Sequence, residues 1–463
     1  AGPVRWARAH KTNVPSGCDR KRRLLSTEQL FASPRTISNM CAVGKSNTCL
    51  QPTWAPSSVG HSVTASPCGG VTGGLRHVSN DERRTRLAVR HHLADHVDTV
   101  EEAAAAVVGL HASDPTTVYL SARARVDGFV ISGLERALYE ERSLVRLWGM
   151  RQTLFVTTRR LAAIMHATAP DAFGAAERRR FERLLTEQNK SADAATWIDH
   201  VESKVIEALS ERGEATANEL RELIPEMREK LTFGEGKSWG GTVGVSTRVL
   251  FMLAAQGRIV RGRPLGSWVS SQYRWALTPH WLGGPLDEME PEAARARLVQ
   301  CWLQQFGPGT ETDIKWWTGW TVRDTRAAIA TLDVADVELD DGAGWLLADD
   351  LDPMEPTADW VALLPSLDPT VMGWKERDWY LGEHAPALFD RNGNAGPTVW
   401  WNGRIVGGWA QREDGEVAVR LLTEVPGIMR EAIEEEANRL TQWLGTVRLI
   451  PRFRTPLERE LTG

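Results

Sequence analysis

The stretch Val243–Thr278, VGVSTRVLFMLAAQGRIVRGRPLGSWVSSQYRWALT, carries the clearest fold signal in the chain. Apolar residues recur at helical spacing along Ser246–Gln256, which predicts an amphipathic helix with Ser246 as its N-cap. Two β-prone runs follow, Arg258–Arg261 and Tyr273–Leu277, with a loop rich in Gly, Pro and Ser between them. A helix followed by such a hairpin is how a winged-helix domain ends.

Basic residues are concentrated in the same stretch, and all of them are arginines. In a winged helix the last helix enters a DNA groove and the hairpin, or wing, lies on phosphates. The planar guanidinium suits this role because it binds two phosphate oxygens at once. The alternative is a protein–protein module whose arginines only solvate a helix face. We expect DNA contacts from Arg248, Arg258, Arg261 and Arg263.

Length and composition indicate a soluble protein of several domains. The 463 residues suffice for two to four domains, and 42% hydrophobic with 25% charged residues is ordinary for a globular chain. No run of about 18 apolar residues occurs, so we expect no membrane contact. The first residues also lack the apolar segment of a secretory signal.

The cysteines and glycines point away from metal and nucleotide chemistry. Four cysteines precede residue 75 and only Cys301 follows, without C-x-x-C spacing, which argues against a disulfide scaffold or a thiolate zinc site. No P-loop, Rossmann glycine motif or H-E-x-x-H is present. We therefore expect a cytoplasmic protein with no metal and no cofactor.

Residues 1–77 differ from the rest of the chain. They are rich in Ser, Thr, Gly and Pro, predominantly basic, and without sustained helical or strand periodicity. This composition favours a disordered leader, which could stem from a wrongly assigned start. The alternative is a basic arm that binds nucleic acid. The remainder is acidic overall, so any DNA contact there must use a local basic face.

The order helix, short helix, helix, hairpin occurs about three times after the leader. It predicts winged-helix units over residues 78–196, 197–284 and 285–357, the first of them holding a candidate active site. From 358 to 463 short β-prone runs dominate, with a hairpin signal at Asn402-Gly403, a long helix over Pro426–Leu444 and a last strand over Val447–Arg452. The predicted fold class is α+β, with tandem winged-helix (helix-turn-helix) units and a C-terminal antiparallel β-barrel-like element.

Polar residues of catalytic type cluster in VVGLHASDPTTVY, residues 107–119. The pattern predicts an apolar helix that runs directly into His111, Ser113 and Asp114, after which Pro115 ends it. Because histidine titrates near neutral pH, His111 could act as a base toward water, and Ser113 and Asp114 could hold that water. The alternative is structural, since Asp-Pro is ordinary capping and turn chemistry.

Three further motifs carry a resemblance to a known family. They are RLWGMRQTLFVTT at 146–158, LLPSLDPTVMGWKERDWYLG at 363–382 and WWNGRIVGGWAQ at 400–411. In these motifs and their order, residues from about 80 to 455 resemble the winged-helix DNA-binding-domain family that includes the AlkZ and YcaQ DNA glycosylases. The resemblance implies tandem winged helices around a β-barrel-like element, and excision of alkylated bases, including interstrand crosslinks, from DNA.

The resemblance also locates the catalytic position. The family's motif, Gln-apolar-Gln or Gln-apolar-Asp, falls on His111-Ala112-Ser113, so neither glutamine is present. The strand RQTLF at 151–155 resembles the family's Arg-Gly-Thr-Leu-His, with Gln152 and Phe155 as departures, and Arg151 joins the candidate DNA-binding residues. An N7-alkylated purine is a cationic leaving group that needs little acid catalysis, so His111 and Ser113 could replace the glutamines.

Together these observations predict a monomeric protein that binds double-stranded DNA. Glycosylase-like hydrolysis of the N-glycosidic bond of alkylated or crosslinked bases is the first interpretation, with His111, Ser113 and Asp114 as the catalytic candidates. The alternative is a non-enzymatic DNA-binding or regulatory protein of the same fold. A third interpretation is an interaction scaffold that binds no nucleic acid.

Overall fold

The computed structural model describes residues 75–168, 171–188, 190–234, 240–449 and 454–463. The described chain mixes helices with small, separate sheets, and the predicted α+β class is confirmed. The expectations for residues 1–74 lie outside the described residues. None of the described helices is both long and apolar enough to cross a membrane.

The first sheet has the strand order β2-β4-β3. Of its four accompanying helices, one precedes its strands along the chain, two lie between β2 and β3, and one follows β4. A tight turn, η2 (Met150–Gln152), joins its two long strands. The strands are β2 (Leu110–His111), β3 (Leu144–Trp148) and β4 (Leu154–Thr158), and the helices are α2 (Val100–Ala106), α3 (Pro115–Arg123), α4 (Ile131–Tyr139) and α5 (Arg159–Ala167).

The second sheet, β5-β9-β8, contains the hairpin that the sequence predicted, and β9 has the expected bounds. Its strands are β5 (Glu214–Thr216), β8 (Ile259–Pro264) and β9 (Tyr273–Leu277). A separate hairpin consists of β6 (Lys230–Phe233) and β7 (Gly241–Gly244). The accompanying helices are α6 (Asp171–Glu187), α7 (Ala194–Arg212), α8 (Ala217–Leu223), η3 (Pro225–Arg228), α9 (Val245–Ala255) and α10 (Thr278–Leu282).

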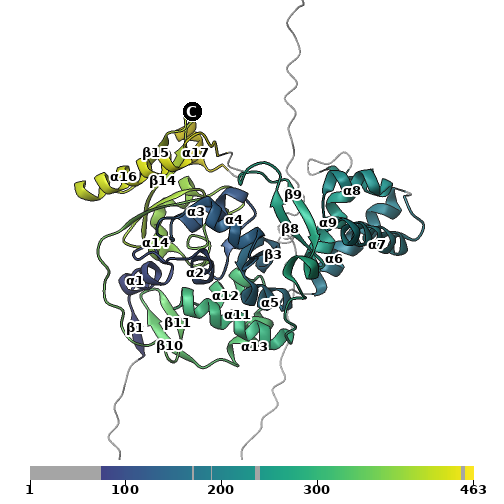
Figure 1. The fold of residues 1–463 in the computed structure, drawn as a ribbon. Helices are drawn as coiled ribbons and strands as arrows, with labels where there is room; N and C mark the ends of the chain where they lie inside the picture. The colour runs from purple at the N-terminus through teal and green to yellow at the C-terminus, as the bar shows by residue number, and fades with distance from the viewer. Residues whose placement is uncertain (1–74, 169–170, 189, 235–239, 450–453) are drawn as a thin grey trace, which may run out of the picture. The chain divides into compact units, whose positions relative to one another are not determined.

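The third sheet joins the first described strand to a hairpin far along the chain, in the order β1-β10-β11. Figure 1 shows α11 and α13 beside this hairpin, and α11 contacts both β11 and α13. The strands are β1 (Arg76–Val78), β10 (Val334–Leu339) and β11 (Gly342–Leu347), and the helices are α1 (Asn80–Arg90), α11 (Pro291–Phe306), α12 (Glu311–Thr318) and α13 (Val322–Ile329).

The fourth sheet is antiparallel, with the order β12-β13-β14-β15. The described strands form no closed ring, so the barrel-like element is wrong for this part of the chain and an open sheet takes its place. The strands are β12 (Val361–Leu364), β13 (Thr398–Trp401), β14 (Arg404–Gln411) and β15 (Val417–Leu421), and the helices are α14 (Asp378–Leu381), η4 (Gly382–His384), α15 (Ala385–Leu388), α16 (Gly427–Leu444) and α17 (Pro456–Thr462).

Three local predictions were wrong. Helix α9 begins at Val245 with Gly244 as its N-cap, because β7 leads directly into the helix, and Ser246 lies buried in the first turn. The predicted last strand is not formed at residues 447–449, and residues 450–452 lie outside the described chain. Arg76 and His77, assigned to the leader, form β1 together with Val78; this strand pairs in parallel with β10 and buries Val78 completely.

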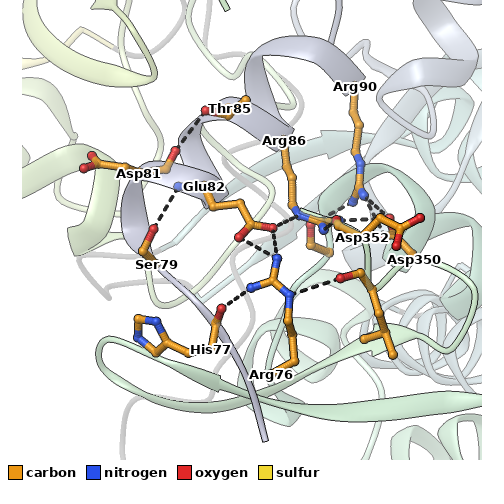
Figure 2. A network of polar contacts seen from close by, with 12 residues as sticks. Arg76, His77, Ser79, Asp81, Glu82, Thr85, Arg86, Arg90, Asp350 and Asp352 are labelled. Atoms are coloured by element: carbon orange, nitrogen blue, oxygen red, sulfur yellow. Dashed lines mark hydrogen bonds and ion pairs between the residues drawn. The ribbon is translucent and has the colours of Figure 1, made fainter. Parts of the chain in front are cut away.

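An ion network holds β1 and α1 against the loop that follows β11 (Figure 2). Glu82 accepts hydrogen bonds from Arg76 and from Arg86, and Asp350 accepts from Arg86 and Arg90. The Arg86 side chain is 1% exposed, so its charge depends on these two carboxylates. The network explains why a strand of three residues is held at this sheet edge.

A second, fully buried ion pair joins α3 to the segment after β12. Arg125 donates to both carboxylate oxygens of Asp368, at 2.9 and 2.7 Å, and both side chains are 0% exposed. Asp368 also accepts from the Ser121 hydroxyl at 2.6 Å and from the Thr370 backbone N–H at 2.9 Å. The Thr370 hydroxyl in turn contacts Nδ1 of His91 at 2.9 Å. The network thus fixes α1, α3 and residues 366–370 to one another.

Removing one partner of this pair is expected to destabilise the fold strongly. Asp368→Asn leaves the Arg125 guanidinium buried without a counter-charge, which should lower the free energy of unfolding by about 3–5 kcal/mol. Equilibrium unfolding in urea measures the change. The matched control is Glu416→Gln, which breaks the exposed pair with Arg412 and should cost less than about 1 kcal/mol. Similar losses in the two variants would contradict the role given to the buried pair.

Candidate active site and nucleic-acid interface

The chain approaches the candidate catalytic residues through a sharp turn rather than along a helix. Helix α2 ends at Ala106, and Val108 (φ 51°) and Gly109 (φ 113°) then turn the chain into β2. A Cβ at Gly109 would lie 3.2 Å from Met165 and 3.3 Å from Phe155, so both the space and the backbone favour glycine. The predicted helix running directly into the site is therefore wrong.

His111 lies in β2, where its backbone pairs with Phe155 of β4. The two rings meet edge to face with centroids 5.6 Å apart, and His111 is 5% exposed. Its Nδ1 is buried without a hydrogen-bond partner among the described residues. An unpaired buried polar atom is costly, so this nitrogen is available to a water or a ligand that reaches it.

Burial changes the acid–base character of His111. Desolvation lowers the pKa of its imidazole to about 3; the positive charge of Arg151 lowers it further, and Asp368 opposes the shift. The expectation that His111 titrates near neutral pH is wrong for this reason. At pH 7 the ring is neutral, and it can orient a hydrogen-bonded water but is a weak base.

Asp114 caps the helix that follows it. Its Oδ1 accepts from the Thr116 backbone N–H at 2.9 Å and from the Thr116 hydroxyl at 2.6 Å. Pro115 occupies the first turn of α3 and therefore begins a helix instead of ending one. The Asp114 carboxylate is therefore a helix cap, as the structural alternative for the Asp-Pro pair proposed. Ser113, which follows His111 by two positions and is half-buried, remains a catalytic candidate.

Arg151 lies in η2, the turn between β3 and β4, with a left-handed backbone (φ 51°) shared by Gln152 (φ 59°). Its guanidinium stacks on the indole of Trp316 in α12, with Cζ 4.0 Å from the ring centroid. Left-handed non-glycine residues are strained and tend to occur at functional sites. The turn places Arg151 close enough to His111 for its charge to lower the histidine pKa.

The arginines of the predicted helix and wing differ in their surroundings. Arg248 is 2% exposed and donates to Glu177 at 2.8 Å, so its guanidinium faces protein and nothing in its position supports a phosphate contact. Arg258 pairs with Glu202 at 3.4 Å, and Arg263 pairs with Glu135 of α4 and with Glu140, the C-cap of that helix. The side chains of the two arginines are each more than 40% exposed. Arg261 lies over the rings of two aromatic residues of β9.

An open groove runs beside the second sheet. Its lining includes Arg258 of the wing, Arg178 of α6 and Arg295 of α11. Acidic residues from the segment between α10 and α11 share the same groove, so its charge is mixed. No group of three or more His, Cys, Asp or Glu side chains that could hold a metal ion occurs in the described parts of the chain.

Comparison with known proteins assigns the family. A family model described as DNA glycosylase AlkZ-like matches residues 104–443, more than half of the chain. The chain belongs to the AlkZ-like DNA glycosylase family. Among curated proteins no sequence matches it. The resemblance inferred from the three sequence motifs is confirmed.

The fold also resembles a solved structure, the DNA glycosylase AlkZ of Streptomyces sahachiroi. The two share 19% sequence identity with a TM-score of 0.59, and the match covers 80% of this chain and 97% of the AlkZ chain. At this identity the likeness concerns the fold alone. In the AlkZ-like scaffold, the position that the sequence analysis assigned to the two catalytic glutamines is occupied here by the buried His111 and by Ser113.

Sequence reasoning missed two residues near this site. Arg377, directly before α14, stacks on the same Trp316 indole as Arg151, with Cζ 4.8 Å from the centroid. Asp368 holds α3 and also acts electrostatically on His111. Both lie in the 363–382 motif that carried the resemblance, so the motif marked their segment. Their partners could not be read from spacing, because Asp368 lies more than 200 positions from Arg125 and from His111, and Trp316 lies outside the motif.

The neutral His111 predicts a pH-dependent stability. A folded-state pKa near 3 against about 6.5 in the unfolded chain means that the unfolded state binds the proton more tightly. Stability from this group is therefore fully present above pH 6.5 and is lost as the pH falls toward 3. His111→Gln should reduce the loss of unfolding free energy between pH 8 and pH 4.5 by about 3 kcal/mol.

Urea unfolding of both proteins across this pH range measures the effect, and the values at pH 8 provide the baseline for each. His91, fully buried with a pKa well below its usual value, keeps part of the acid sensitivity in the variant. Parallel pH profiles for the two proteins would show that His111 is not held neutral by the fold.

Proposed function

We propose that this protein binds double-stranded DNA through winged-helix units and excises alkylated bases at a site centred on His111. The winged-helix assignment is supported by the order α7, β5, α8, η3, β6, β7, α9, β8, β9. Apart from the inserted η3 and β6–β7 hairpin, three helices and a short strand precede the β8–β9 hairpin, and β5, β8 and β9 form one sheet. The DNA assignment is supported by membership of the AlkZ-like family. We propose that the first and third sheets, with their helices, complete a tandem arrangement.

One observation carries the enzymatic part of the proposal: the unpaired, buried Nδ1 of His111 at the family's catalytic position. Chemistry on a base within the duplex is sterically barred, so the target nucleotide must be extruded toward β2. Once extruded, a water held by the imidazole would face C1′ of the sugar. Ser113, two residues along the chain, is proposed to help to hold the water.

The proposed reaction suits a weak base. An N7-alkylated purine carries a positive charge, and cleavage of the C1′–N9 bond neutralises it because the bonding electron pair moves onto the base. The water oxygen then bonds to the oxocarbenium carbon, and the resulting oxonium is a strong acid. A neutral imidazole with a pKa near 3 is basic enough to take that proton, although it could not deprotonate free water efficiently.

A non-enzymatic DNA-binding protein is the second candidate function. It is favoured by two observations: neither family glutamine is present, and the carboxylate of Asp114 is engaged as a helix cap. Under this interpretation His111 is a buried structural residue of β2. The two functions differ in whether the wild-type protein releases a base.

Single-turnover incubation with duplex DNA carrying N7-methylguanine, or an N7-linked interstrand crosslink, decides between them. We expect the wild type to release the base and His111→Ala to slow release by about 10²-fold while binding DNA normally, because the positioned water is lost. Ser113→Ala should slow release less, since a second water can replace a hydroxyl. His200→Ala, exposed on α7 and outside the groove that Arg258 lines, is the matched control.

Release that is equally fast in His111→Ala would refute the role of this residue. No release by the wild type from either substrate, with DNA binding intact, would establish the non-enzymatic candidate instead.

The wing is proposed to supply phosphate contacts through Arg258, Arg261 and Arg263. Exposed ion pairs contribute little, so the glutamate partners of Arg263 can be exchanged for phosphate oxygens at small cost. The partner of Arg258, Glu202, is buried, but it keeps a second cation, Arg178, if Arg258 turns to a phosphate. Replacing all three with Ala should weaken binding and reduce the slope of log K against log salt by about 0.9 per lost contact. Fluorescence anisotropy over a range of salt concentrations measures both quantities.

The matched control replaces three other exposed arginines that also pair with glutamates, Arg412, Arg420 and Arg439. It should leave the salt slope unchanged. A slope that falls equally in both triple variants would mean that general charge, not the wing, binds the DNA.

A further inference from the structure

Two arginines share a single indole next to the candidate active site. The Cζ atoms of Arg151 and Arg377 lie 4.0 and 4.8 Å from the ring centroid of Trp316. The three residues come from η2, from the loop before α14 and from α12, segments far apart in the sequence. Two like charges on one ring repel each other, and each cation–π contact offsets only about 0.5–2 kcal/mol of that cost.

The scaffold holds this arrangement in place before any ligand arrives. Asp313 of α12 is 0% exposed and accepts the backbone N–H groups of Lys375 and Glu376, both at 2.8 Å, which ties the loop of Arg377 to the helix of Trp316. Helix α12 ends at Gly319 in a left-handed conformation (φ 76°), where a Cβ would lie 3.2 Å from Cγ of Arg151. Glycine therefore allows the helix end to approach the η2 turn closely.

Neither guanidinium is neutralised by the described residues. No ion pair to a carboxylate forms at Arg151 or Arg377 in the described parts of the chain, whereas other buried arginines, such as Arg125 and Arg248, have one. Nη1 of Arg377 is buried without a hydrogen-bond partner. Burial and the charge of Arg377 together lower the pKa of Arg151 to about 10, so it remains protonated at neutral pH.

We propose that Arg151 and Arg377 form a clamp for one phosphodiester of DNA, on the strand that presents the extruded nucleotide to His111. A phosphate supplies what the pair lacks, namely negative charge and several acceptor oxygens for planar donor groups. Both guanidinium groups contact the indole face, so in the clamp their N–H groups would donate to the phosphate. Because η2 leads into β4, which pairs with β2, the clamp and His111 are parts of one hairpin framework.

The clamp depends on the proposed function because its ligand is DNA, but it does not depend on catalysis. The experiment that tests it therefore measures DNA binding alone. The probe is a duplex with one tetrahydrofuran abasic site, which offers an extrudable sugar-phosphate without a base, compared with the same duplex undamaged. Affinity and salt dependence are measured by fluorescence anisotropy for the wild type, Arg377→Gln and Arg377→Lys.

We expect the wild type to prefer the abasic duplex. Arg377→Gln should lower affinity for that duplex by about tenfold and reduce its salt slope by about 0.9, with little effect on the undamaged duplex. Arg377→Lys keeps the charge but loses the planar fork, so it should recover the slope and only part of the affinity. Arg391→Gln, exposed in the loop after α15, is the matched control, and unfolding midpoints confirm that each variant folds.

Unchanged affinity and slope in Arg377→Gln would overturn the clamp, whatever the protein does to alkylated bases. Equal losses on both duplexes would overturn its placement on the extruded strand. A wild type that releases no base, but shows the expected loss on the abasic duplex, would support the clamp and refute the glycosylase function.

Discussion

The ion pair between Arg125 and Asp368 is the constraint on which the site depends. Two charges without access to water are stable only when most of their donors and lone pairs find partners. Here Ser121 and Thr370 add hydrogen bonds to both groups, and among the described residues only Nε of Arg125 stays unpaired. The pair fixes the end of α3 against the segment after β12. Because only three residues separate the end of β2 from the start of α3, this contact also constrains the position of His111.

Other arginines of this protein also carry charges that are partly removed from water, and the faces of aromatic rings stabilise these charges. Arg83 lies over Trp379, Arg142 over Trp281 and Arg146 over Tyr273, in addition to the pair on Trp316. Tryptophan is unusually frequent in this chain, with 20 residues, and these contacts give part of the reason. In a protein of net negative charge, a ring can hold an arginine without neutralising its charge, as at the pair on Trp316.

Periodicity predicted most of the helices, because an amphipathic pattern reflects which face is buried. The bounds of β9 agree with those expected from the sequence, α16 begins one residue later than expected, and the α+β class was correct. Helix α3 was missed since Pro115 can either end a helix or begin one, and only the Asp114 cap decides. The division into units at residues 78, 197, 285 and 358 stays a prediction.

The site was predicted less well than the fold. The family motif located His111. The neutral state of its imidazole depends on burial by β4 and on the charge of Arg151, and neither can be predicted from the sequence around His111 alone. Arg248 was expected to contact DNA because arginines are concentrated in the predicted helix and wing. In the structure Nη1 of Arg248 donates a hydrogen bond to Glu177 of α6, and an arginine with such a partner can be buried.

The parallel pairing of β1 with β10 has a consequence for how the chain folds during synthesis. Val78 reaches its partner strand only after residue 339 has been made, and Arg125 waits for residue 368. Until then the first helices carry a strand edge without a neighbour and a guanidinium without its carboxylate. Contacts of such sequence separation are formed late and slowly. The N-terminal part of the described chain is thus completed by its C-terminal part, and the buried pair beside α3 cannot form before Asp368 has been made.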